Sequence, residues 1–519
     1  MTLSAAHTTW PQFPYFTDPL RYWRSFAPDR IALIDKTRNI RLSYSQLDHE
    51  SDRWAALLSE KGVGKGHRVA VISGNRYEVA ALFFACIRIG AALVPLNWRL
   101  APAELSAILA HSQSSLIVGE LRFRDSLTNA AGFEAMPEWI DVDTIPTNSG
   151  LWTDADDIES ESDGAVLILY TSGSTGQPKG VIIPHRQILY NAIATTTAWE
   201  LGHEDIAPVS TPFFHTGGWN VFATPLWHRG GTVVLFDQFD PATFIAGLNE
   251  ERCTVALTVP TQLIMMLSSK EWGVPLPHLR FFISGGAPCP PAVIKKVRGA
   301  GYTLREGYGL TECGPNCFAM SSDESLENPG TVGRPVPFLQ MRLISDDGTE
   351  AGLSEPGELQ LRGPQMFAGY LHDPQRTAEV ITDDGWLRTG DLAMRDENGL
   401  FAICGRKKEM YISGGENVFP GEVESALASH PEISEVVVVG IPHELWGETG
   451  CAFVVPKSNS KVVTSEEIVA FARQNLAGYK VPRTVFVVTE LPRLGSGKPD
   501  RRDLAVRGAA SASTAPSVA

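Results

Sequence analysis

The sequence predicts an α/β protein, with a large multi-layer N-terminal domain of mainly parallel sheets followed by a small α+β domain. Its 519 residues are too many for one ordinary core, so two or three domains are expected. Before Gly405, short apolar runs alternate with segments of helical spacing, which favours parallel strands connected by helices. Beyond Gly405 the pattern becomes a compact mixture of strands and helices over roughly a hundred residues, an ordinary domain size.

Apolar spacing defines the elements of the first part. Helical spacing covers residues 44–60 and resumes from Tyr77, and residues 68–72 form a short apolar run. Further strands are expected at residues 165–170, 232–236, 254–259 and 280–284, and a helix at residues 185–199. The most apolar stretch, residues 79–96, is interrupted by Arg88 and Gly90. It therefore predicts a packed helix leading into a strand and no transmembrane segment.

The second part contains two helical and three strand patterns. Helices are expected at residues 420–429 and 465–475, and strands at residues 435–439, 451–455 and 484–488. The expected domains are therefore residues 1–406 and 407–507. Residues 508–519, which are rich in Ala and Ser, are expected to form a disordered tail.

Composition limits the classes of function. The chain has 44 basic and 59 acidic residues, and its net charge of -15 disfavours nonspecific binding of nucleic acid. A few oriented donors can still hold a phosphate group locally. Seven scattered cysteines, and an N-terminus without a basic region leading into an apolar core, predict a cytoplasmic protein.

Residues 170–180 carry the strongest local signal, Tyr-Thr-Ser-Gly-Ser-Thr-Gly-Gln-Pro-Lys-Gly, directly after an apolar strand. Glycines let the backbone turn tightly and point its N–H groups at an anion, hydroxyls add donors, and Lys179 adds charge. The spacing is not that of a Walker A loop, and a polar surface turn is the alternative on composition alone. The candidate phosphate-binding residues are Thr171, Ser172, Gly173, Ser174, Thr175, Gly176 and Lys179.

This loop resembles the signature of the adenylate-forming superfamily, which includes acyl-CoA synthetases, adenylation domains of nonribosomal peptide synthesis and beetle luciferases. Four further segments match in the superfamily's order, at residues 284–288, 307–312, 385–391 with 405–408, and 491–498. The residues before the loop resemble the superfamily more diffusely, so the similarity covers nearly the whole chain. It implies that the C-terminal domain is mobile and that the N-terminal domain binds AMP and an acid.

The resemblance assigns residues to the nucleotide. Gly285, Gly286 and Ala287 are expected along the adenine, and Gly307, Tyr308 and Gly309 are further nucleotide-binding candidates. Of these, Tyr308 would stack on the ring, and Thr311 would contact the α-phosphate. Glu312 would hold Mg²⁺ together with Thr175, which suits an ion that prefers hard oxygen ligands. Asp391 and Arg406 would bind the ribose hydroxyls, because a carboxylate offers two acceptor oxygens.

Lys498 is the candidate catalytic lysine. It ends the segment Leu-Pro-Arg-Leu-Gly-Ser-Gly-Lys, and its ammonium would bridge the acid and the α-phosphate. Pro499 stands where members of the superfamily usually carry an apolar residue such as Ile. The resemblance also implies a hinge at Lys408. After rotation, a tunnel for the pantetheine of CoA would be lined by Ser413, Gly414, Gly415 and Glu416.

The sequence gives less specific evidence for the residues that bind the acid than for those that bind the nucleotide. His215, in the segment Phe-Phe-His-Thr-Gly-Gly, matches a superfamily position beside the acyl carboxylate, where positioning or gating is expected and proton transfer is not. A hydrogen-bonded core histidine is the alternative. Trp219 and Asn220 are candidates for the acyl pocket, although a tryptophan here is equally compatible with the core. Phe213, Phe214 and residues 263–267 suggest an apolar pocket.

The leading hypothesis is an ATP-dependent acyl-CoA ligase that uses Mg²⁺, ATP and CoA and activates a medium- or long-chain fatty acid or an aryl acid. The alternatives are adenylation of an amino acid or acyl group for a carrier protein, a luciferase-like monooxygenase, and a noncatalytic nucleotide-binding regulator. Intact Lys498, Glu312 and Asp391 argue against the regulator. The sequence leaves open whether the protein forms a homodimer and which acid it uses.

Overall fold

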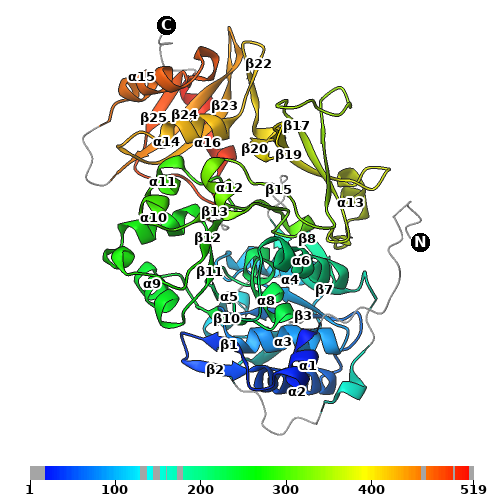
Figure 1. The fold of residues 1–519 in the computed structure, drawn as a ribbon. Coiled ribbons are helices and arrows are strands. Elements are labelled where there is room, and N and C mark those ends of the chain that lie inside the picture. Colours follow the sequence, from blue (N-terminus) through cyan, green and yellow to red (C-terminus); the bar gives the residue numbers. More distant parts are fainter. Residues whose placement is uncertain are drawn as a thin grey trace.

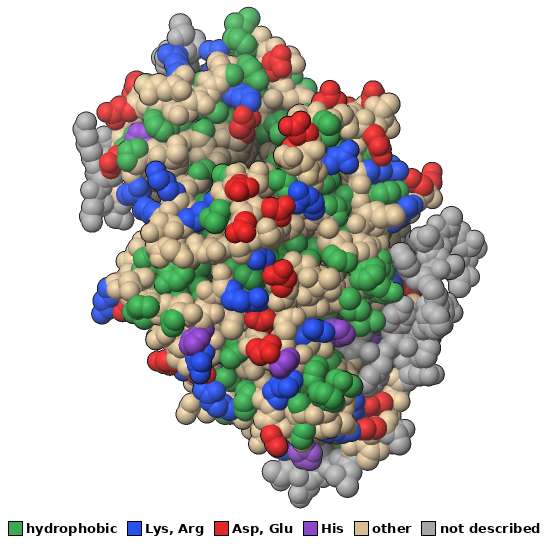
Figure 2. Space-filling view, in the orientation of Figure 1, with side chains coloured by type: hydrophobic (Ala, Val, Ile, Leu, Met, Phe, Trp, Pro, Cys, Tyr) green, Lys and Arg blue, Asp and Glu red, His purple; other side chains and the backbone are tan. Residues whose placement is uncertain are grey.

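The fold was analysed in a computed structural model, which describes residues 18–128, 137–143, 152–158, 161–171, 179–457, 463–494 and 497–512. Figure 1 shows a large body with α1, α2 and α3 at its base and a smaller unit with α14, α15 and α16 at the opposite end. On the face drawn in Figure 2, acidic and basic side chains are interspersed and do not gather into one basic surface. Within the described residues, no helix is long and apolar enough to cross a membrane.

A seven-stranded sheet forms the centre of the body, in the order β18-β8-β7-β4-β3-β5-β6. Neighbouring strands from β7 to β6 run parallel, while β8 and β18 add two antiparallel neighbours at one edge. The predicted α/β class with mainly parallel sheets is confirmed. The strands are β3 (Arg68–Ile72), β4 (Ala92–Pro95), β5 (Leu116–Gly119), β6 (Glu138–Asp141), β7 (Ala165–Thr171), β8 (Lys179–Pro184) and β18 (Gly369–Tyr370).

Two further sheets of the body are also largely parallel. One has the order β2-β1-β10-β9, and the other has the order β11-β12-β13. Their strands are β1 (Ile31–Asp35), β2 (Ile40–Ser43), β9 (Ile206–Val209), β10 (Thr232–Leu235), β11 (Val255–Thr258), β12 (Phe281–Ser284) and β13 (Leu304–Glu306). These strands agree with the predicted ones to within one residue at each end where the sequence predicted them.

Helices cover these sheets. The helix predicted at residues 44–60 is α2 (Tyr44–Glu60), which begins with a reciprocal capping box between Ser43 and Gln46. The other helices of the body are α1 (Pro19–Phe26), α3 (Tyr77–Arg88), α4 (Pro102–Ser112), α5 (Arg124–Thr128), α6 (His185–Ala198), α7 (Thr216–Asn220), α8 (Ala223–Arg229), α9 (Pro241–Glu250), α10 (Pro260–Ser268), α11 (Pro291–Gly299), α12 (Ser322–Glu327) and α13 (Pro374–Val380).

An antiparallel sheet, β16-β17-β19-β20, connects the body to the C-terminal unit. Residues 318–319 and 334–335 pair separately as β14 (Phe318–Ala319) and β15 (Arg334–Pro335). The strands of the connecting sheet are β16 (Gln340–Ile344), β17 (Gly357–Arg362), β19 (Leu387–Arg395) and β20 (Phe401–Arg406). Because β20 ends at Arg406, the next segment leaves this sheet at the place where the domain boundary is predicted.

The C-terminal unit has its own sheet, β22-β21-β24-β23, with β25 paired to β24. Its elements are β21 (Tyr411–Ser413), β22 (Glu416–Val418), β23 (Ile433–His443), β24 (Gly447–Pro456), β25 (Thr484–Val487), α14 (Pro420–Ala428), α15 (Ser465–Asn475) and α16 (Arg501–Ala512). The expected tail from residue 508 is wrong for its first five residues, which continue α16. Gly508 is buried in this helix, and a Cβ there would lie 3.0 Å from Cys451 Sγ, so glycine lets α16 pack closely on the sheet.

The apolar stretch at residues 79–96 forms α3 and β4, as predicted. Arg88, which interrupts it, is fully buried, and its guanidinium donates to three carboxylates. The donor–acceptor distances to Asp18, Asp48 and Asp52 are all 2.7 Å. A buried charge is tolerated when it is paired and hydrogen-bonded, and this arginine ties the segment before α1 to α2 and α3.

Replacing Arg88 by Met should destabilise the body by about 3–5 kcal/mol, because the variant leaves the buried carboxylate of Asp18 without its ion-pair partner, while Asp48 and Asp52 keep Arg21. The measurement is the urea dependence of unfolding, followed by tryptophan fluorescence. Arg229→Met, at an exposed arginine at the end of α8, is the matched control and should change stability by no more than about 0.5 kcal/mol. Equal stability of the two variants would contradict the assigned role of Arg88.

Candidate functional site

The ends of the glycine-rich loop are fixed by strand pairing. β7 ends at Thr171 and β8 begins at Lys179, and these two residues are partners in the antiparallel register. The loop therefore leaves and re-enters the sheet at one point, at the carboxyl end of β7, where ligands of such sheets commonly bind. Ser172, Gly173, Ser174, Thr175 and Gly176 lie outside the described residues, so their predicted phosphate contacts stay predictions.

Glu312 lies next to this point, in a 3-10 turn at Thr311–Cys313. Its carboxylate accepts a hydrogen bond from the phenol of Tyr370 at 2.8 Å and is 3.9 Å from Nζ of Lys179. The turn is held by two further bonds: Gln187 Nε2 donates to the carbonyl of Thr311 at 2.9 Å, and the Phe367 N–H donates to that of Glu312 at 2.7 Å. A carboxylate and a lysine are thus fixed at the base of the glycine-rich loop.

The residues predicted along the adenine lie where the parallel strands β12 and β13 end. The N–H of Gly307 donates to the carbonyl of Ser284 at 2.8 Å, which joins the two predicted segments. Gly309 has no room for a side chain, because a Cβ there would lie 2.2 Å from the backbone of Pro315. Gly286 has a φ of 80°, which glycine adopts without strain. Gly285, Gly286 and Ala287 keep partly or fully exposed surface.

The register of β19 and β20 brings together the two residues predicted at the ribose. Asp391 and Arg406 are direct partners across these strands, and Arg406 Nε lies 2.8 Å from Asp391 Oδ1. The phenol of Tyr308 donates to the other carboxylate oxygen. Burial raises the pKa of Asp391, while the guanidinium of Arg406 and the bond from Tyr308 oppose that shift.

Lys498 reaches the same region from the C-terminal unit. Its side chain is exposed to water, yet protein surrounds it closely enough that desolvation lowers its pKa, and the charge of Arg406 lowers it further. Asp391 and Glu409 act in the opposite direction. Lys498 and Asp391 thus influence each other across the boundary between the body and the C-terminal unit.

His215 also lies within range of Lys498. It precedes α7 as the N-cap residue, and its ring contacts Phe214 edge to face at 4.7 Å between centroids. Burial lowers the pKa of His215 to about 4, and the positive charges of Lys498 and Arg99 add to the effect. The imidazole is therefore neutral near pH 7 and can accept or donate one hydrogen bond without carrying charge.

The predicted tunnel residues form a tight hairpin turn and do not contact this site. Ser413 and Glu416 pair across β21 and β22, and Gly414 and Gly415 between them have φ values of 63° and 88°. Two successive positive φ values are typical of the turns that favour a Gly-Gly pair. The turn packs on Trp446, which lies between β23 and β24, and Figure 1 places β22 in the C-terminal unit, at the end of the molecule opposite α1–α3. Lys408, the predicted hinge, is exposed in a 3-10 turn, Lys407–Glu409, that directly follows β20.

The residues predicted for the acyl pocket divide between the core and the surface. Trp219 and Asn220 are both fully buried. The indole of Trp219 donates to the carbonyl of Phe213 and stacks on its ring at 4.0 Å, while Asn220 accepts from the hydroxyl of Thr224 at 3.0 Å. Leu263 and Met266 are likewise core residues, whereas Ile264 and Met265 are exposed, and the acyl pocket stays a prediction. The buried hydrophobic residues of these segments pack in the core, which is the usual location of hydrophobic side chains.

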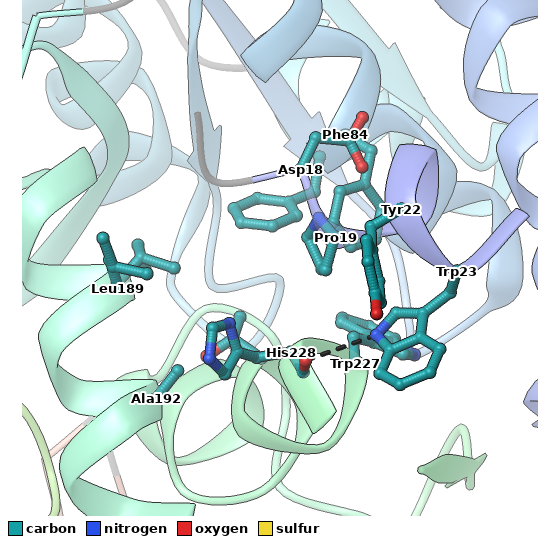
Figure 3. A pocket seen from close by; sticks show the side chains of 12 residues that line it. Asp18, Pro19, Tyr22, Trp23, Phe84, Leu189, Ala192, Trp227 and His228 are labelled. Carbon is teal, nitrogen blue, oxygen red and sulfur yellow. Dashed lines mark hydrogen bonds between the residues drawn. The ribbon is translucent and has the colours of Figure 1, made fainter. Parts of the chain in front are cut away.

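A cavity of about 320 Å³ lies behind these rings, between α1, α3, α6 and α8. Figure 3 shows Tyr22 and Trp23 on one side of it, with Leu189 and Ala192 of α6 opposite. Phe83 lines the cavity and packs on Trp219, whose other neighbour is Phe213. The cavity is therefore separated from His215 by aromatic rings and contains none of the predicted reaction residues.

Sequence reasoning missed three polar residues that organise the site. Tyr370 ends the segment Ala-Gly-Tyr. This pair of a glycine and an aromatic residue is the only local pattern that could have indicated a functional role for Tyr370. Gln187 and Asn191 are one helical turn apart on α6 and are almost completely buried. Asn191 Nδ2 donates to the carbonyl of Asn220 at 2.7 Å, so one face of α6 supports both the Glu312 turn and the helix after His215.

Comparisons with protein families, individual proteins and solved structures all find similarity to enzymes that bind AMP or join acids to CoA. Family descriptions named "AMP-binding enzyme" and "AMP-binding enzyme C-terminal domain" match residues 21–371 and 422–498. Indoleacetate–CoA ligase of Aromatoleum aromaticum is 36% identical over 474 residues, which cover 89% of this chain and 92% of that protein. A long-chain-fatty-acid–CoA ligase of Mycobacterium tuberculosis is 33% identical over 487 residues, with 92% and 95% coverage.

Among solved structures, o-succinylbenzoate CoA synthetase of Bacillus subtilis, in complex with its acyl-adenylate intermediate, matches with a TM-score of 0.85. It is 28% identical, and the match covers 95% of this chain and 98% of that one. The same enzyme in complex with ATP and a magnesium ion matches with a TM-score of 0.84. The chain belongs to the AMP-binding enzymes, as the sequence motifs predicted. It is an enzyme whose similar relatives are ligases that join acids to CoA.

The geometry around His215 makes a prediction about its titration. Because burial and nearby cations disfavour the imidazolium, His215 should stay neutral down to about pH 4. Lys498→Ala removes one of these cations and should raise the pKa of His215. The measurement is NMR titration of carbon-labelled histidines, with the signal assigned by its loss in His215→Asn. Lys295→Ala, at an exposed lysine of α11, should leave the titration unchanged. A His215 midpoint above 6 would contradict the assigned environment.

Proposed function

We propose that this chain is an acyl-CoA ligase that converts a carboxylic acid and ATP to an acyl-adenylate and pyrophosphate, then transfers the acyl group to CoA with release of AMP. The observation that carries the proposal is that Lys498, in the C-terminal unit, lies within electrostatic range of Asp391, Arg406 and His215 of the body, so that its charge bears on the pKa of Asp391 and of His215. In this proposal, residues 1–406 bind AMP and the acid, and residues 407–507 form the mobile domain.

The first half-reaction joins two anions, so the site must supply positive charge and alignment. Lys498 is proposed to bridge the attacking carboxylate and the α-phosphate, where its ammonium stabilises charge in the transition state. Thr311 is proposed to contact the same phosphate. Asp391 and Arg406 are proposed to hold the ribose, and their pairing across β19 and β20 supports this role because it fixes both side chains before a nucleotide binds.

Glu312 is the proposed magnesium ligand. Its carboxylate provides hard oxygen donors beside the base of the glycine-rich loop, and the hydrogen bond from Tyr370 orients it. This donor set fits Mg²⁺, which is usually held by one or two carboxylates together with substrate phosphates. When bound with Glu312 and Thr175, the ion would neutralise charge on the departing pyrophosphate.

The second half-reaction needs no nucleophile from the protein, because the thiol of CoA attacks the acyl carbonyl. In the structure, Lys498 lies within electrostatic range of Arg406 and Asp391 of the body, while the hairpin at residues 413–416 packs on Trp446 of the C-terminal unit. We propose that rotation about Lys408 exchanges the two, so that Ser413, Gly414, Gly415 and Glu416 line the path of the pantetheine. Neutral His215 is proposed to position the acyl carboxylate.

The acid is proposed to be an aryl or arylalkyl acid or a medium- to long-chain fatty acid. The names of the relatives support both classes, and no further choice between them follows from the buried Trp219 and Leu263. Thermal-shift measurements with ATP, Mg²⁺ and a panel of indole, cinnamate and alkanoate acids would identify the best ligand, since ligands that bind the native state raise its stability.

Adenylation of an amino acid is the second candidate, and the electrostatics of the site disfavour it. An amino-acid substrate brings an ammonium group, which needs an acidic partner. The charged groups that act on His215 are Lys498 and Arg99, and both are cations. Pyrophosphate release measured with and without CoA separates this candidate from the ligase.

Lys498→Ala should lower the rate of acyl-adenylate formation about a hundredfold or more, because one stabilising cation is lost from the transition state. Thioester formation from a supplied acyl-adenylate should be largely retained. The measurements are acid-dependent exchange of pyrophosphate into ATP, and release of AMP from the acyl-adenylate with CoA. Lys295→Ala is the control. Equal loss of both half-reactions would refute the proposed role.

Lys408→Pro should slow thioester formation more than adenylation, because proline fixes φ and restricts rotation about the proposed hinge. Lys408→Ala is the matched control, since it removes the side chain without restricting the backbone. Single-turnover measurements of both half-reactions provide the test. If the proline variant matched the alanine variant in both steps, the hinge would not lie at this residue.

A further inference from the structure

Tyr370 stands between the two charged groups at the base of the glycine-rich loop. It belongs to β18, which pairs with β8, so its ring lies over the strand that begins with Lys179. Lys179 Nζ donates to the phenol oxygen at 3.1 Å, and the phenol donates to Glu312 Oε1 at 2.8 Å. The ammonium also lies 4.4 Å from the centroid of the ring, within the range of a cation–π contact.

This bridging geometry keeps two opposite charges apart. Lys179 and Glu312 are 3.9 Å from each other at their closest atoms, which is too far for a direct hydrogen bond. The phenol has one proton, which it gives to Glu312, and its oxygen accepts from Lys179. Burial and the neighbouring charge of Glu312 raise the pKa of Tyr370, so the hydroxyl keeps that proton.

The opposite charges of Lys179 and Glu312 attract each other, and at 3.9 Å the phenol of Tyr370 links them by hydrogen bonds. Without that hydroxyl, the ammonium could move within hydrogen-bonding distance of the carboxylate, where a charge-assisted hydrogen bond is strong. Such a pair would occupy both the carboxylate and the ammonium.

We propose that Tyr370 is a positioning residue whose hydroxyl holds Lys179 and Glu312 apart, which leaves the carboxylate available to Mg²⁺ and the ammonium available to a phosphate. The inference rests on the proposed function, because it assigns those ligands to the two groups. It extends that function to a residue in β18, a strand with no other proposed role in the reaction.

Tyr370→Phe tests the proposal while preserving the packing. The variant keeps the ring, its edge contact with Phe367 at 5.0 Å and the backbone bond from Tyr370 to Thr377. The probe is α,β-methylene-ATP, titrated calorimetrically without acid, in the presence and absence of Mg²⁺. The measured quantity is the gain in affinity that Mg²⁺ provides. Because the lost bond joins a charged group, we expect that gain to fall about tenfold or more in the variant.

Tyr44→Phe is the matched control. It also removes a buried tyrosine hydroxyl, one that donates to the carbonyl of Gly231 at 2.8 Å in the body away from the site. Its gain from Mg²⁺ should equal that of the unmodified enzyme, even if its melting temperature falls. An unchanged gain in Tyr370→Phe would overturn the proposal.

A double-mutant cycle distinguishes a positioning role of the Tyr370 hydroxyl from the simple loss of its hydrogen bond to Glu312. If the hydroxyl acts by keeping Lys179 from Glu312, then Tyr370→Phe should change the gain from Mg²⁺ at most about threefold once Lys179 has been replaced by Met. Fully additive effects of the two substitutions would overturn the proposal. If the unmodified enzyme itself shows neither analogue binding nor pyrophosphate exchange with any acid of the panel, the proposed function fails, and this inference fails with it.

Discussion

Mutual repulsion among cations, opposed by two carboxylates, is the constraint on which the site depends. The charge of Arg406 lowers the pKa of both Lys498 and Lys179, so one guanidinium lies close to both ammonium groups. Asp391 and Glu312 oppose this repulsion and keep the cations in place. A cluster of cations of this kind favours a ligand that carries negative charge. The chain as a whole has a net charge of -15, but the electrostatic potential inside a cleft is set mainly by the charged groups that line it.

The scaffold fixes these charges by three different means. Strand register places Asp391 opposite Arg406, and the pairing of β7 with β8 places Lys179 at the end of the glycine-rich loop. A buried polar face of α6 supports the turn that carries Glu312. Lys498 differs from the others because it belongs to the C-terminal unit, where it lies between β25 and α16. In the proposed mechanism, this lysine can therefore move away while the groups of the body stay in place.

Much of the fold could be predicted from local pattern. Strands β3 and β12 follow from short apolar runs, and α2 and α15 from helical spacing with good caps. Aromatic and aliphatic residues near His215 suggest a pocket, but hydrophobicity alone does not distinguish a side chain that lines a cavity from one that fills the core. Trp219 and Leu263 fill it. At the C-terminus, composition suggested a tail, whereas packing of Gly508 on the sheet extends α16.

The class of enzyme and the identity of its charged groups could be predicted from the chain, because motifs of glycine, hydroxyl, carboxylate and lysine residues are local and keep a recognisable order. The way in which those groups meet depends on the folded structure. Tyr370 is 191 residues from Lys179 and 58 from Glu312, and no spacing along the chain indicates that its hydroxyl lies between them. Long-range sheet pairing and the placement of the C-terminal unit set these contacts, and both depend on packing that a linear pattern does not contain.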